Sequence, residues 1–445
     1  MPDGTSTTQA PLQRGDLRDF SDRLPPVLVK ELRQGLRGKM FVVPFLVLQG
    51  LLMLSSGQGT RSQTQFFWHC LAIMLVCLLP SRNLGALGEE RQANTLDTLI
   101  LTRLTPWRIV WGKWCATAAQ SALTAVAAMP YLLVRYLNSG TNFVHEGLLL
   151  LVLLLLSGAM AGVFTVFSTV SSPLARNGLA AAVLAVAYGA FCFPLIQILS
   201  SGPQPGFSSI GAMAVTALWA TLFCLSHAAS TIAPASENHS TPRRLLSFAA
   251  LLLCGAINRF VAAPDFYLVA GSLVILLFSC AVEMGERIPE FPVVRWRGLP
   301  GKAMAAVFHP GWPSGVVFSA GLWTLAAVLF ADSIDLRFLQ FATLCFVPVT
   351  ARLVLPSRMR QGTAPFVLLA AASQLLSLLA GQLLPWGWSD LAAFLPAVRP
   401  RPPLLEPILP MALFWGALAL IVAIGPLVRL VRRLGENPDQ PQNSP

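Results

Sequence analysis

The chain has 445 residues, of which 55% are hydrophobic and only 11% are charged, with a formal net charge of +11 and a mean hydropathy of +0.64. Soluble proteins carry about 25% charged residues, so this composition excludes an ordinary soluble enzyme or binding domain. We expect an all-α, polytopic membrane protein, in which helices satisfy the backbone hydrogen bonds inside the bilayer.

The first 39 residues are polar and basic, and they contain no cleavable signal-peptide pattern. Residues 1–20 are rich in Thr, Gln, Gly and Pro, which is typical of a disordered tail. From residue 25 onward an apolar stripe is flanked by charges, which predicts a basic amphipathic helix in the lipid headgroup layer. The charged residues of this interfacial helix include Lys30, Glu31, Arg33 and Arg37.

Twelve apolar segments follow, and most are long enough for a helix that crosses a bilayer. They lie at 40–56, 66–80, 111–134, 147–170, 178–199, 209–232, 245–258, 266–282, 314–331, 338–356, 364–384 and 406–428. We divide them into a six-span core at 40–232 and an additional six-span region at 233–434. A polar tail at 435–445 ends the chain.

The distribution of basic residues predicts the orientation of these spans. With a cytoplasmic N-terminus, the outer loops hold only six of the 31 Lys and Arg residues, and the remaining 25 lie in cytoplasmic segments. This asymmetry is what the positive-inside rule describes, so we expect both termini in the cytoplasm. The positive charge is therefore a topology signal, and we expect no nucleic-acid partner. The six outer residues are Arg61, Arg135, Arg259, Arg337, Arg399 and Arg401.

Between the second and third spans, the segment 81–113 combines charges with a short amphipathic pattern. Asn94 is a candidate N-cap, with Asp97 three residues later. Leu96, Leu99 and Ile100 then fall on one helical face. The dipeptide 105–106, Thr-Pro, predicts the start of the helix that re-enters the membrane, because proline is favoured at the first helical position. Charges of this density cannot lie in hydrocarbon, so we predict a surface helix between spans 2 and 3.

This segment resembles a signature of the membrane subunits of type-2 ABC transporters, E-R-E-x-G-T-L-E-x-L-L-x-T-P-L-S followed by an apolar-x-G-K motif. The matching residues are Glu90, Arg91, Thr95, Leu96, Asp97, Leu99, Ile100, Thr102, Leu104, Thr105, Gly112 and Lys113. The chain departs from the signature at Gln92, Ala93, Asn94 and Arg103. A second phrase typical of the family, N-P-x-x-x-K-E-L-R-x-x-x-R, is similar to residues 25–37.

The resemblance implies the permease subunit of an ATP-driven transporter, an exporter in a bacterial inner membrane. It also implies a cytoplasmic ATPase subunit as partner, together with a second permease unit in a complex of two permeases and two ATPases. The amphipathic helix would be the coupling element that contacts the ATPase. Its expected coupling residues are Glu89, Glu90, Arg91, Thr95, Leu96, Asp97, Leu99 and Ile100. The resemblance covers residues 23–135 and extends to 232 by span pattern, but it leaves the second six spans unexplained.

Signatures of enzymes are missing from the sequence. Residues 298–303 lack the spacing and the final Ser or Thr of a phosphate-binding loop, so ATP hydrolysis is expected on another chain. The histidines form no metal-binding pattern, and we expect neither a metal nor a cofactor. His145 and Glu146 are interpreted as a solvated pair in an outer loop. Asp332 and Asp335 are the only outer acidic pair close in sequence, and we expect no catalysis from them.

Two other functions remain open. An ion- or proton-coupled carrier would need ionisable groups at mid-bilayer depth, where each is costly. The span interiors instead contain glutamines at positions 49, 120, 197 and 374. Without a titrating relay, energy from an outside ATPase is favoured. The six additional spans also suggest a membrane scaffold that transports nothing.

Small residues in the fourth span predict close helix packing. Gly158, Ala159, Ala161 and Gly162 form a face on which a second helix can approach. All eight cysteines fall inside predicted spans, where we expect them to act as small apolar packing residues.

Overall fold

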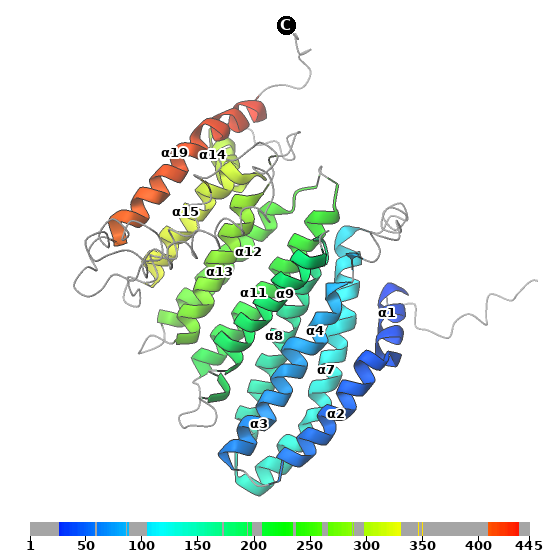
Figure 1. The fold of residues 1–445 in the computed structure, drawn as a ribbon. Coiled ribbons are helices and arrows are strands. Elements are labelled where there is room, and N and C mark those ends of the chain that lie inside the picture. The colour runs from blue at the N-terminus through cyan, green and yellow to red at the C-terminus, as the bar shows by residue number, and fades with distance from the viewer. Residues whose placement is uncertain are drawn as a thin grey trace, which may run out of the picture.

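A computed structural model describes a large part of the chain. The described residues are 26–57, 60–85, 87–88, 105–170, 173–193, 195–197, 207–234, 237–259, 266–286, 288, 298–330, 346, 349 and 408–435. Within these ranges every regular element is a helix, as the composition predicts. The helices run side by side as an elongated bundle (Figure 1).

The first half of the bundle begins with the predicted interfacial helix. Its elements are α1 (Pro26–Arg37), α2 (Lys39–Ser55), α3 (Arg61–Ala72), the π-helical segment η1 (Ile73–Leu78), α4 (Leu79–Ser81), the 3₁₀ turn η2 (Arg82–Leu84), α7 (Pro106–Ser139), α8 (Phe143–Phe167), α9 (Pro173–Val186) and the π-helical segment η3 (Ala187–Cys192). Consecutive α3, η1, α4 and η2 form one continuous helical rod.

The second half of the bundle consists of six helices that pack against one another. These are α11 (Phe207–Ile232), α12 (Ser240–Arg259), α13 (Phe266–Gly285), α14 (Gly298–Phe308), α15 (Trp312–Leu329) and α19 (Ile408–Gly435). Figure 1 shows α11 in the middle of the bundle, between α8 and the pair α12 and α13.

Every predicted span that falls within the described residues coincides with a helix. The segments predicted at 338–356 and 364–384 lie almost wholly outside the described residues. Six of the described helical rods are long and apolar enough to cross a membrane, and a seventh is added if the bent pair α1–α2 counts as one span. The chain is therefore an all-helical protein with several membrane-spanning helices, and twelve spans stays a prediction.

Several helices extend beyond the predicted spans, and the extensions of α7 and α8 change the placement of charged residues. The third predicted span ends at residue 134, but α7 continues to Ser139 through an internal proline, Pro130. The fourth begins at Phe143, because the side chain of Asn142 accepts a hydrogen bond from the His145 amide and caps α8. Arg135, His145 and Glu146 consequently lie inside helices and are buried, so the prediction that His145 and Glu146 form a solvated pair in an outer loop was wrong.

The apolar interior consists of two large clusters and a small one between them. The first joins α2, α3, η1, α7, α8 and η3, and the second joins α11, α12, α13, α15 and α19. The predicted small-residue face of α8 lies against α11: a side chain at Gly162 would meet Cys224 Cβ at 3.2 Å. The close approach of these helices is confirmed, and it connects the two halves. None of the seven described cysteines forms a disulfide.

Candidate functional site

The predicted coupling helix lies outside the described residues, which stop at residue 88 and resume at 105. The structure therefore does not test the coupling roles of Glu89, Glu90, Arg91, Thr95, Leu96, Asp97, Leu99 and Ile100. It does describe both flanks of this segment and the interfacial helix α1. All three lie at the same end of the bundle, together with α14 (Figure 1).

The flank before the segment is fastened by polar side chains at the end of the α3–η2 rod. Arg82 Nη1 donates to Gln120 Oε1 at 2.5 Å and to the Gly35 carbonyl of α1 at 3.4 Å. The neighbouring Asn83 is buried and accepts a 2.5 Å hydrogen bond from the Thr117 hydroxyl. Its amide also donates to Thr165 on α8. Buried polar groups require such partners, so this network holds the chain in one position.

The flank after the segment is the first part of α7. As predicted, Thr105 precedes the helix and Pro106 is its first residue. Lys113 Nζ lies 3.3 Å from Glu31 Oε1 on α1, and Trp114 Nε1 donates to the Gly158 carbonyl at 2.8 Å. Closer to the start of α7, Val110 joins a buried apolar cluster that includes Leu225 of α11. The start of α7 is thus held by α1, α8 and α11.

The interfacial helix α1 is connected to both flanks. A bend of 58° separates its axis from that of α2, so α1 turns away from the direction of the span. Glu31 faces α7, whereas the side chains of Lys30, Arg33 and Arg37 are exposed. Of the four charged residues predicted for this helix, Glu31 therefore contacts α7, and the three basic residues lie on the surface.

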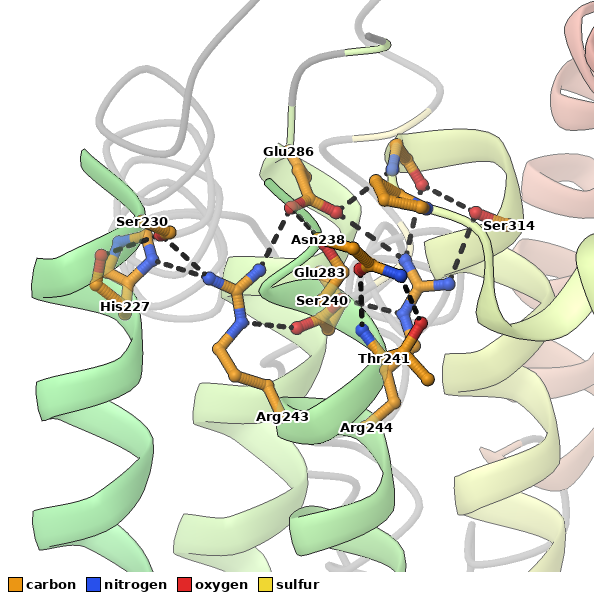
Figure 2. Close-up of polar contacts among 12 residues, drawn as sticks. His227, Ser230, Asn238, Ser240, Thr241, Arg243, Arg244, Glu283, Glu286 and Ser314 are labelled. Atoms are coloured by element: carbon orange, nitrogen blue, oxygen red, sulfur yellow. Dashed lines mark hydrogen bonds and ion pairs between the residues drawn. The ribbon is translucent and has the colours of Figure 1, made fainter. Parts of the chain in front are cut away.

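A second polar site, not predicted from the sequence, lies at the same end in the second half. We call Arg243, Arg244, Glu283 and Glu286 the four-charge cluster. Arg243 Nε lies 3.0 Å from Glu283 Oε1, and Arg244 Nε lies 2.7 Å from Glu283 Oε2 (Figure 2). Glu286 also contacts both arginines, at 3.0 and 3.6 Å. The two arginines and the two glutamates thus balance each other's charge in the interior of the bundle.

The four-charge cluster also fixes the turn between α14 and α15. Arg244 Nη1 donates to the carbonyls of Val307 at 2.6 Å and His309 at 2.9 Å, at the C-terminal end of α14. A cation at this end satisfies carbonyls that the helix leaves unpaired. Gly311, with φ of 122°, donates its amide to Glu286 at 2.9 Å. Only glycine readily adopts this backbone conformation, so the turn and the cluster depend on each other.

Electrostatics favour the charged form of the carboxylate at the edge of the cluster. Burial raises the pKa of Glu286, but Arg243, Arg244 and hydrogen bonds from Ser240 and Gly311 outweigh it, so the net pKa lies below its usual value. The imidazole of His309 is buried, which lowers its pKa. The cluster therefore connects α12, α13 and the α14–α15 turn through hydrogen bonds. Among the described residues, no group of acidic, His and Cys side chains has the arrangement of a metal site.

Sequence reasoning missed these pairs because their partners are far apart along the chain. Arg243 and Glu283 are separated by 40 residues, and the arginines were attributed to topology alone. A second buried pair, at the opposite end of the bundle, was missed for another reason: its residues are only 11 apart, and both were expected in the outer loop between the third and fourth spans. Arg135 Nη2 donates to Glu146 Oε1 at 2.9 Å, and its guanidinium lies 4.8 Å from the Phe67 ring centroid.

Comparison with known proteins found no matching family model, no significantly similar curated protein and no significantly similar solved structure. The class of the protein therefore rests on its fold, and that class is a multi-pass, α-helical membrane protein.

Proposed function

We propose that the chain is the permease subunit of an ATP-driven transporter of the type-2 ABC class, acting as an exporter. A separate cytoplasmic ATPase would dock at the end of the bundle that carries α1. A second permease unit would complete the translocation path. The chain itself would supply no catalytic residue, metal or cofactor.

The observation that carries this proposal is the connection of α1 to both flanks of residues 89–104. Arg82 contacts the Gly35 carbonyl from the first flank, and Glu31 pairs with Lys113 on the second. A partner that pushes on the intervening segment would therefore move α7 and α1 together. An ATPase can drive transport only through contacts that differ between its own states, and a segment held at both ends can pass on that difference.

The test compares one substitution in the expected coupling helix with one just before it. Leu99→Asp places a charge on its apolar face, which would be costly at an apolar contact. Glu89→Ala removes one charge just before that helix, and an exposed ion pair contributes only about 0–1 kcal/mol. We expect Leu99→Asp to insert normally but to lower transport-linked ATPase activity or complex assembly by at least about tenfold, and Glu89→Ala to change them by less than about fivefold, in keeping with those energies.

These measurements use the reconstituted complex, with membrane insertion checked separately. The purified chain alone should hydrolyse no ATP. Wild-type activity and assembly of Leu99→Asp would show that this helix is not the coupling element. Specific nucleotide binding by the isolated chain would contradict the assignment of hydrolysis to a partner.

A second candidate function is an ion- or proton-coupled carrier, and one observation favours it. Arg135, near the end of α7, and Glu146, in the first turn of α8, form a buried ion pair, and ionisable pairs within membrane helices often lie on transport paths. Such a carrier would transport its substrate in vesicles depleted of ATP but holding an ion gradient. ATP-dependent transport without a gradient would exclude it.

A further inference from the structure

We infer that α1 and the outward face of α2 together form a binding site for one anionic phospholipid. The headgroup would contact cations of α1 and of the α1–α2 junction, and an acyl chain would lie along α2. The two parts are continuous in the chain, because only Gly38 separates the helices.

The headgroup part is a row of exposed cations. Lys30 and Arg37 are seven residues apart, which places them on the same face of α1, and Lys39 begins α2. All three side chains are exposed. The one acidic residue of α1, Glu31, is turned toward Lys113 on the protein side. The outward side of α1 therefore carries a positive charge that nothing on the same helix neutralises.

The acyl-chain part is an apolar stripe on α2. Met40 and Leu54 are 80% and 77% exposed, and Val43 and Val47 continue the stripe between them. The opposite face of the helix, with Phe41, Leu48 and Leu52, is buried in the bundle. At 1.5 Å per residue the stripe is about 21 Å long, which exceeds the roughly 15 Å of hydrocarbon in one leaflet.

The combination of these parts selects the ligand. A zwitterionic headgroup would bring its own cation against Lys30 and Arg37, whereas an anionic headgroup lacks that repulsion. An acidic protein surface would match the cations but would leave the apolar stripe of α2 uncovered. A second copy of the chain placed symmetrically on this face would bring the two cationic α1 helices together. An anionic phospholipid satisfies both the charge and the apolar surface.

The experiment is native mass spectrometry of the full chain with equal amounts of phosphatidylglycerol and phosphatidylcholine. The test variant carries Lys30→Gln, Arg37→Gln and Lys39→Gln. The matched control carries Lys302→Gln, Arg429→Gln and Arg432→Gln, which removes three exposed cations from α14 and α19 at the same end of the bundle. A third variant, Lys30→Arg with Lys39→Arg, retains the charge at the proposed site.

We expect wild type, control and the charge-retaining variant to prefer phosphatidylglycerol, and the test variant to lose that preference by about tenfold or more. Equal binding of both lipids by wild type, or equal losses in test and control variants, would overturn the site. The outcome is independent of the proposed transport function, since the assay contains no ATPase. A chain that binds the lipid but assembles with no ATPase would keep this inference and reject that function.

Discussion

Single residues matter most where charges are buried, and Glu283 is the clearest case. Its two carboxylate oxygens pair with Arg243 and Arg244, and none of the three side chains is more than 1% exposed. Replacing a buried ion cluster with apolar residues is often harmless, but removing one partner leaves an uncompensated charge. The cluster is therefore sensitive to one-sided changes.

We predict that Glu283→Gln lowers the free energy of unfolding by about 3–5 kcal/mol, because two buried arginines lose their shared counter-ion. The control is Glu237→Gln, at a half-exposed carboxylate paired with His239, which should change it by less than about 0.5 kcal/mol. Denaturant unfolding in mixed micelles measures both. Equal effects of the two substitutions would show that the cluster contributes no special stability.

The pH dependence of stability follows from Glu286 of the four-charge cluster and from His309 beside it. The pKa of His309 in the folded chain lies below its usual 6.5, so the unfolded chain binds more protons as pH falls through 6.5. The free energy of unfolding should then decrease, by at most about 1.4 kcal/mol per pH unit. The pKa of Glu286 is lowered below 4.5, so its contribution, present above that pH, is lost at still lower pH.

The measurement is the free energy of unfolding of wild type and of His309→Gln between pH 8 and pH 5. These two pH values are roughly equidistant from the usual histidine pKa. The decrease that begins near 6.5 should be smaller in the variant than in wild type, because the variant lacks one of the five histidines and keeps the other four. Superimposable pH profiles would mean that the buried, neutral imidazole does not contribute.

At the scale of elements, the docking of α1 depends on a glycine contact. A Cβ atom at Gly35 would come within 2.0 Å of the Gln120 amide, whereas nothing lies within 4 Å of a Cβ at Gly50 on α2. The two glycines therefore form a matched pair, one at a helix–helix contact and one facing outward.

We predict that Gly35→Leu displaces α1 and destabilises the chain by about 1–3 kcal/mol, as overpacking does. Gly50→Leu should be neutral or slightly stabilising, because leucine favours helix over glycine by nearly 1 kcal/mol. Hydrogen exchange of α1 amides is the direct measurement. Unchanged α1 protection in Gly35→Leu would show that this contact does not hold the helix.

At the scale of the whole molecule, the two ends of the bundle carry different chemistry. The end with α1 and α14 holds the four-charge cluster and the exposed cations of α1 (Figures 1 and 2). The opposite end holds the start of α3, with Ser62 exposed. By the positive-inside rule we expect the first end in the cytoplasm.

Labelling of single cysteines in intact cells tests this orientation. An impermeant thiol reagent should modify Ser62→Cys from outside but should not modify Gln92→Cys or Lys302→Cys. All three should react after the membrane is opened, which controls for accessibility. Efficient outside labelling at position 92 would reverse the predicted topology.

The sequence by itself determined the helical class and the approximate positions of the helices in the described residues, except for α14, which no predicted span covers. Long apolar runs must form helices in a bilayer, and proline after Thr105 begins α7 where expected. These are local properties, set by hydropathy and backbone chemistry within a few residues. The small residues of the fourth span likewise predicted a close contact, although not that its partner is α11.

Only the tertiary structure decided which charges meet. The bundle brings Arg244 beside Glu283 and Arg135 beside Glu146, and it fastens α1 to Lys113 through Glu31. An ion pair depends on where two helices lie in space, and sequence separation carries little information about that. Hydropathy specifies that a segment is a helix, but it does not specify which neighbouring helix its polar residues will face. From the sequence, the basic residues therefore indicate only the side of the membrane on which a segment lies.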